Sequence, residues 1–303
     1  MSAAAKPALA AAPRKRLFAR LLSCIRMDEV LVLQGTPLFG ALFSMGALTK
    51  AKCFELIVLM AANSCLVAHV FVLNDLSGSS TDVRDPNRSG QVFAVRGIGR
   101  REAAALCAAL LIVSLLLLIP FGMTVLLLAL AVAIASALYS FLLKGAPVAS
   151  SLLHLAGGLL HFLLGYSLFH ALDLRGLEIG SFFALTFAGG HLTHEARDFA
   201  SDLANGIRTN AVKFGRAPTF AAGFVLFTAA DVLLIVMAIR GVVPHALIMI
   251  GALYPLHFYW TLRTFYTGLT FENIRRLQTG YRILYAVIGL MMVLTESGSF
   301  RGA

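Results

Sequence analysis

The sequence predicts an all-α, multi-pass membrane protein, a helical bundle of about nine transmembrane helices around a central cavity. Of the 303 residues, 59% are hydrophobic and only 13% are charged, with a mean hydropathy of +0.83. A water-soluble surface of this size requires far more charge. The apolar residues also come in blocks of about twenty, the length of helix that crosses roughly 30 Å of hydrocarbon.

Glycine, proline and charged residues divide these apolar blocks into nine expected spans. Their ranges are 30–49, 54–76, 102–119, 122–142, 147–171, 180–197, 217–239, 243–262 and 281–297. The third and fourth spans are separated only by a Pro-Gly hairpin at 119–122. Long connections are expected at 77–101, 198–216 and 263–280, and the last is expected to lie along the membrane surface.

The distribution of positive charge predicts the orientation. Residues 1–27 carry six basic residues and no acidic one. With this segment inside the cell, the outer segments hold only Lys50, Lys52, Arg175, Arg240 and Arg301 of the 25 Lys and Arg residues. Segments rich in Lys and Arg stay on the cytoplasmic side, which explains the net charge of +10 without a nucleic-acid partner.

We therefore expect two parts in a protein of the inner (cytoplasmic) cell membrane. Residues 1–27 form a basic, partly disordered N-terminal arm in the cytoplasm, and residues 28–303 form the transmembrane domain. The three long connections share the arm's side of the bilayer, so function is expected at the cytoplasmic face.

Two acidic segments end the second and sixth spans at this face. The first contains Asp75 and Asp82, and the second contains Glu195, Asp198 and Asp202. The second group is spaced i, i+3 and i+7, which places all three carboxylates on one stripe of a helix, where like charges repel. A hard cation would relieve this repulsion, and an all-oxygen ligand set favours Mg²⁺ bridging to a phosphate. A solvated helix cap that uses acids for solubility is the alternative.

Basic residues surround the acids in the sequence: Arg84, Arg88, Arg96, Lys144, Arg208 and Lys213. Each alone fits ordinary cytoplasmic topology. Together with the acids they indicate a metal–diphosphate site, in which metal and cations share the charge of the anion.

The acidic segments resemble those of the UbiA superfamily of intramembrane prenyltransferases. That family's first motif reads NDxxDxxxD, and here Asn74, Asp75 and Asp82 match, with Gly78 in place of the middle Asp and Asp85 close by. A Tyr-Ser-x-x-x-Lys signature is met by Tyr139, Ser140 and Lys144. The second motif, DxxxD with its tail, is matched by Asp198, Asp202, Gly206, Thr209, Ala211, Val212, Lys213 and Gly215.

The resemblance implies Mg²⁺-dependent transfer of an isoprenyl group from an isoprenyl diphosphate to an aromatic or lipophilic acceptor. It implies a nine-span helical fold in membrane lipid, with the active site on the cytoplasmic side. The implied metal ligands are Asn74, Asp75, Asp82, Asp85, Asp198 and Asp202. The implied diphosphate-binding residues are Arg88, Tyr139, Lys144 and Arg208. The implied catalytic residues are Asp75, Asp82, Asp198, Asp202 and Lys144.

The sequence leaves two alternatives open. The loss of the middle Asp favours a terpene cyclase of the same superfamily, in which the substrate's own double bonds capture the cation. Ser77–Ser80, with its glycine, is not expected to hold a rigid helix. An ion-coupled transporter is a lesser alternative. Transporters place charges near the membrane midplane, whereas these acidic residues lie at an edge of the membrane.

Several polar residues within the spans need a separate interpretation. His191 and His194 are candidates for a base near the second motif. His154 and His161 share one face of the fifth span and are expected to form buried hydrogen bonds. Asp231, inside the seventh span, is expected to pair with a polar group across the bundle.

Overall fold

The computed structural model describes residues 20–82, 93 and 97–299, and within this part of the chain it contains helices and no strand. The long helices are α4 (Lys50–Asp82), α5 (Arg100–Leu118), α6 (Met123–Leu138), α7 (Ala149–Tyr166), α8 (Leu174–Ala204), α10 (Arg216–Ile239), α11 (Tyr254–Thr267) and α12 (Phe271–Ser299). The short helices are α2 (Met27–Val32), α3 (Gly35–Ser44) and α9 (Asn210–Phe214). The remaining turns are the 3-10 segments η2 (Ile119–Phe121) and η4 (His245–Leu253) and the π-helical turn η3 (Tyr139–Leu143).

Six of the described helical segments are long and apolar enough to cross a membrane: 50–78, 100–121, 123–143, 149–166, 216–239 and 271–296. This pattern agrees with the predicted multi-pass membrane bundle. The predicted total of nine spans stays a prediction, because the first expected span consists of two short helices and the eighth begins as the 3-10 segment η4.

The break in the first expected span lies between α2 and α3. Pro37 is in the first turn of α3, where its missing N–H costs no helical hydrogen bond. At this break the side chain of Gln34 makes two hydrogen bonds. It donates to the carbonyl of Val30 at 2.9 Å and accepts from Asn63 at 3.0 Å. His161 completes this buried chain by contacting Asn63 Oδ1 at 2.6 Å. The expected buried hydrogen bond of His161 is confirmed.

Two expectations about the connections are wrong. Helix α4 continues through Ser77 and Gly78 to Asp82, although glycine disfavours helix. Gly78 is buried, so packing outweighs its weak propensity. The connection expected at 263–280 is also mostly helical, because α11 extends to Thr267 and α12 begins at Phe271, and residues 268–270 alone join them.

Glycines allow the central helices to approach closely. A Cβ on Gly165 of α7 would lie 1.8 Å from the carbonyl oxygen of Pro37, and one on Gly40 of α3 would lie 2.1 Å from that of Phe162. Small residues permit such backbone contacts between membrane helices. The α3–α7 contact therefore fixes α7, which carries part of the site described below.

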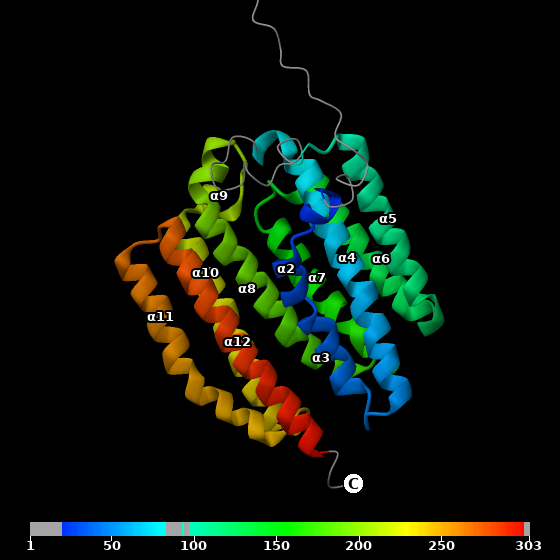
Figure 1. Cartoon of the computed structure of the whole chain (residues 1–303). Coiled ribbons are helices and arrows are strands. Elements are labelled where there is room, and N and C mark those ends of the chain that lie inside the picture. The colour runs from blue at the N-terminus through cyan, green and yellow to red at the C-terminus, as the bar shows by residue number, and fades with distance from the viewer. Residues whose placement is uncertain (1–19, 83–92, 94–96, 300–303) are drawn as a thin grey trace, which may run out of the picture.

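The bundle has two ends with different contents. At one, here called the motif end, the C-terminal ends of α4 and α8 lie together with α9 (Figure 1). At the opposite end, Arg175 joins three elements. Its guanidinium donates to the carbonyls of Phe43 at 3.1 Å and Val242 at 3.2 Å and lies 3.7 Å from Glu296.

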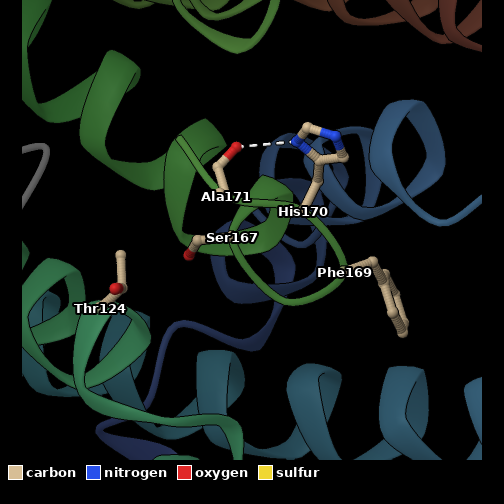
Figure 2. A pocket seen from close by; sticks show the side chains of 5 residues that line it. All are labelled: Thr124, Ser167, Phe169, His170 and Ala171. Carbon is tan, nitrogen blue, oxygen red and sulfur yellow. Dashed lines mark hydrogen bonds between the residues drawn. The ribbon is translucent and has the colours of Figure 1, made fainter. Parts of the chain in front are cut away.

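A pocket at the opposite end lies between the start of α6 and the loop after α7 (Figure 2). It is lined by Thr124, Ser167, Phe169, His170 and Ala171. No residue of the predicted site is among them.

Candidate functional site

The first acidic segment is engaged by the N-terminal part of the chain. Asp75 on α4 is buried, and Arg26, the residue before α2, forms a bidentate ion pair with it, with Nε 3.2 Å from Oδ2. The guanidinium of Arg26 also lies over the ring of Phe71 at 5.7 Å. No pattern in the sequence points to Arg26, because a contact 49 residues apart depends on the fold.

Asn74, the neighbour of Asp75, carries a buried side-chain oxygen, Oδ1, that has no hydrogen-bond partner among the described residues. A buried acceptor without a donor costs about 1–3 kcal/mol. Such an oxygen beside a carboxylate suits a hard cation, which binds oxygen ligands.

The second acidic segment is held by a neighbouring arginine. Asp198 is buried, and Arg197 contacts both carboxylate oxygens, at 2.7 and 3.1 Å. Arg197 also donates to Gln278 of α12 at 2.8 Å and lies over Phe271. Asp202, one turn further along α8, is partly exposed at the motif end. The expected helical stripe is confirmed, since α8 runs continuously through 195, 198 and 202.

The first five residues of the predicted Tyr-Ser-x-x-x-Lys signature form the π-helical turn η3, and Lys144 follows it directly. Single π turns occur often at functional sites. This turn packs against both α4 and α7. The ring of Tyr139 meets His154 of α7 edge-on at 4.6 Å and His191 of α8 at 6.0 Å. The signature therefore lies between the helices that carry the two acidic segments.

The connection from Lys144 to α7 contains an unusual backbone conformation. Val148 has φ +66° and ψ −54°, and the N–H of Ala149 donates to the carbonyl of Pro147 at 2.8 Å. This is a γ-turn of the rare positive-φ kind, which is strained for a β-branched residue. The side chain of Asn210 holds it, because its Oδ1 accepts the N–H of Val148 at 2.7 Å.

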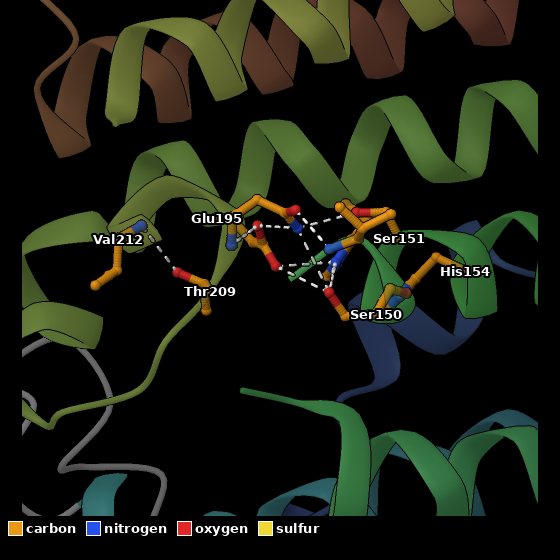
Figure 3. Close-up of polar contacts among 9 residues, drawn as sticks. Ser150, Ser151, His154, Glu195, Thr209 and Val212 are labelled. Carbon is orange, nitrogen blue, oxygen red and sulfur yellow. Dashed lines mark hydrogen bonds and ion pairs between the residues drawn. The ribbon is translucent and has the colours of Figure 1, made fainter. Parts of the chain in front are cut away.

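Asn210 is in turn held by Glu195, which is 5% exposed. Oε2 of Glu195 accepts the backbone N–H of Asn210 at 2.9 Å and its side-chain amide at 2.8 Å. Oε1 accepts from Ser150 at 3.4 Å and lies 3.1 Å from His191 Nε2. Figure 3 shows this cluster between α7, α8 and the loop before α9. Glu195 is thus used for hydrogen bonds to the protein, which the acidic stripe alone did not indicate.

The loop after α8 brings a second predicted cation close to the first. The backbone N of Arg208 lies 3.7 Å from the position that a Cβ on Gly145 would take. Gly145 follows Lys144 directly, so the two cationic residues come from adjacent backbones. Thr209 then caps α9 by accepting from the N–H of Val212 at 3.4 Å (Figure 3). Lys213 is exposed.

Part of the predicted site lies outside the described residues: Arg84, Asp85, Arg88 and Arg96. Asp82 is the last residue of α4, and only its backbone is described. The described members of the predicted ligand and diphosphate sets are Asn74, Asp75, Tyr139, Lys144, Asp198, Asp202 and Arg208.

The fold and site define a class of protein: a helical membrane bundle with acidic helix ends and cationic turns gathered at one end. The UbiA prenyltransferase family matches residues 35–270. The chain belongs to this family. A comparison with curated proteins gave no match.

Solved structures share the fold. A UbiA homolog from Archaeoglobus fulgidus bound to DMAPP and Mg²⁺ is 19% identical, with a TM-score of 0.69 over 92% of this chain and 99% of that one. The apo structure of a UbiA homolog from Aeropyrum pernix K1 is 20% identical, with a TM-score of 0.68 over 89% and 98%. A digeranylgeranylglyceryl phosphate synthase is 17% identical, with a TM-score of 0.70 over 93% and 99%.

Proposed function

We propose that this protein is a Mg²⁺-dependent intramembrane prenyltransferase that ionises an isoprenyl diphosphate at the motif end and transfers the prenyl group to an aromatic or lipophilic acceptor. One observation carries the proposal. The η3 turn packs against α4, whose end bears Asp75, while its Tyr139 meets His191 on α8, the helix that bears Asp198. A diphosphate beside Lys144 would thus have acidic residues on two sides.

The donor chemistry of these residues suits a divalent cation, although the described residues contain no group of three or more His, Cys, Asp or Glu side chains placed to hold one. Carboxylates and an amide oxygen form the donor set, and Asn74 Oδ1 is a buried acceptor without a described partner. Asn74, Asp75, Asp198 and Asp202, with Asp82 and Asp85, would hold Mg²⁺. The metal would supply charge stabilisation to the diphosphate leaving group. Similar folds in an Archaeoglobus fulgidus homolog have been solved with DMAPP or GPP and Mg²⁺, which supports this assignment.

The chain's own residues would bind and orient the substrate. Lys144 and Arg208, on adjacent backbones, would neutralise the departing diphosphate together with Arg88, and Tyr139 would contact the same group. Arg26 and Arg197 pair with Asp75 and Asp198, so these buried carboxylates are compensated within the protein. The apolar helices around them would exclude water, so that the carbocation reaches its acceptor. The site would face the cytoplasm, as the distribution of basic residues predicts.

The test is diphosphate release from geranyl diphosphate by the purified protein, with and without MgCl₂. Turnover that requires Mg²⁺ and falls at least a hundredfold in Asp198→Asn and Asp202→Asn is expected. Turnover that survives both substitutions would end the proposal.

A terpene cyclase is the second candidate, and the departure at Gly78 favours it. Because α4 stays helical there, position 78 faces the bundle without a carboxylate. Incubation with farnesyl or geranylgeranyl diphosphate and no acceptor distinguishes the two reactions. A cyclic hydrocarbon or terpene alcohol favours the cyclase, and a product that needs an added acceptor favours the transferase.

A further inference from the structure

One titratable side chain near the site has no role in diphosphate binding. His154 lies on α7, one turn after Ser150, and its ring stacks on that of His191 with centroids 3.6 Å apart and planes at 9°. Tyr139 meets it edge-on, and Phe187 stacks on it at 5.9 Å. Two imidazoles in face-to-face contact are unusual for an apolar helix, where polar side chains face protein or a cavity.

The hydrogen bond of His154 fixes its tautomer. Nδ1 lies 2.8 Å from the backbone carbonyl of Ser150. A carbonyl oxygen only accepts, so Nδ1 carries the proton and Nε2 of the neutral ring carries a lone pair. No described residue hydrogen-bonds to Nε2. His191 differs, because its Nε2 is directed at Glu195 and Ser150, at 3.1 and 3.4 Å.

Burial places this lone pair inside the bundle. Helix periodicity puts His154 on the same face of α7 as Ser150, Gly158 and His161, which are all buried. Leu152, on the opposite face, is 60% exposed. His154 is partly exposed, and it lies on the face of α7 that is turned toward the bundle rather than on the face of Leu152. Its stacking partner His191 lies seven residues before Asp198, about 10 Å deeper along α8.

We propose that His154 is the proton acceptor of the reaction, an inference that rests on the proposed function. The C1–O bond of the isoprenyl diphosphate breaks, and its electron pair leaves with the diphosphate. A carbon or oxygen atom of the acceptor, or a double bond of the substrate in a cyclase, forms the new bond to the cation. The proton that this step releases goes to the Nε2 lone pair of His154.

The titratable groups around His154 come from η3 and α8. The groups that face it are Tyr139 from η3, His191 and His194 from α8, and Glu195 behind His191. Positioned bases of this kind contribute about 10²–10⁴ in rate.

The test measures which products the prenyl cation forms. Purified wild-type protein and His154→Gln are incubated with geranyl diphosphate, MgCl₂ and 4-hydroxybenzoate as the phenolic probe. Diphosphate, prenylated phenol, olefins and prenyl alcohols are quantified together. A cation captured by bulk water returns its proton to solvent and does not need His154.

In His154→Gln we expect diphosphate release within about threefold of wild type, at least a tenfold lower yield of prenylated phenol and olefin, and more alcohol. His161→Gln is the matched control: it changes a buried histidine on the same face of α7 and is expected to lower Tm without changing the product ratio. An unchanged ratio in His154→Gln, or diphosphate release that falls in step with product, would overturn the proposal. Absence of Mg²⁺-dependent release in the wild type would instead overturn the proposed function.

Discussion

Among the residues that the structure describes, a carboxylate meets a histidine in two buried clusters, and the surroundings of these clusters differ. Between α7 and α8, Glu195 contacts His191, which stacks on the partly exposed His154. Between α10, α11 and α12, Asp231 Oδ2 lies 3.1 Å from His257 Nδ1, and Tyr285 donates to Oδ1 at 3.4 Å. The expected partner of Asp231 across the bundle is thus His257.

The second cluster is closed. His257 is 0% exposed, and Nε2 has no hydrogen-bond partner among the described residues. Its ring is surrounded by aromatic edges from Phe224, Phe227, Tyr254 and Tyr281. A carboxylate–histidine pair is therefore not by itself a sign of chemistry. The partial exposure of His154 and the hydrogen bonds from Glu195 to Asn210 at the motif end distinguish the first cluster, whereas the second joins three helices.

The largest difference in the rate of diphosphate release is expected between substitutions of Asp198 and of Asp231. Asp198→Asn should lower Mg²⁺-dependent diphosphate release at least a hundredfold, because it removes a buried charge from the acidic end of α8. Asp231→Asn should leave release within about threefold. Both are measured as initial rates with geranyl diphosphate. Equal losses in the two variants would contradict the distinction between the clusters.

Loss of the hydrogen bonds that link Glu195, Asn210 and Val148 should have the next largest effect on activity. Asn210→Ala removes the acceptor of the Val148 N–H and the amide bound to Glu195, so the γ-turn behind Lys144 loses its support. We expect kcat/KM for geranyl diphosphate to fall about ten- to a hundredfold, with a higher KM.

Ser151→Ala is the control for this coupling. It removes one hydroxyl that accepts from Asn210 at 3.0 Å and leaves the bonds to Val148 and Glu195 intact, so a fall below threefold is expected. If both variants lose the same activity, Asn210 does not act through the γ-turn.

The closed cluster should affect stability more than kinetics. Asp231→Ala leaves His257 and Tyr285 without their buried acceptor, which costs about 1–3 kcal/mol. Thermal unfolding in detergent should show a lower Tm for this variant. The double variant with His257→Ala should lose less than the sum of the single losses, because the two residues share one contact. Additive losses would show that they do not interact.

The smallest effect concerns a carboxylate outside both clusters. Asp173 precedes α8 and accepts the N–H of Gly176 at 2.8 Å, and this hydrogen bond lowers the pKa of its carboxyl group. A lowered pKa in the folded state contributes stability above the unfolded pKa, and this contribution is lost as pH falls through the folded pKa.

Asp173→Ala should cost about 1 kcal/mol at neutral pH through loss of the helix cap. The difference in Tm from wild type should shrink in acid, where the carboxyl group of the wild type is protonated. A difference that stays constant from pH 7 to pH 3 would contradict this assignment.

The sequence alone determined that the molecule is a helical membrane protein and which motifs make up its motif end. Blocks of apolar residues define membrane helices through their length, and motif spacing places Asp198 and Asp202 on one helical stripe, which α8 confirms. The signature from Tyr139 to Lys144 was identified as a unit, although its π-helical shape was not.

Tertiary structure decided which polar groups meet. The pairing of Arg26 with Asp75 and of Asn210 with Val148 joins residues 49 and 62 positions apart, and no local pattern encodes such contacts. Tertiary packing also decides that the helix continues through Gly78 and that His154 and His257 have different surroundings. Helix propensity and residue type act locally, whereas burial, tautomer and access to the interior depend on which helices pack together.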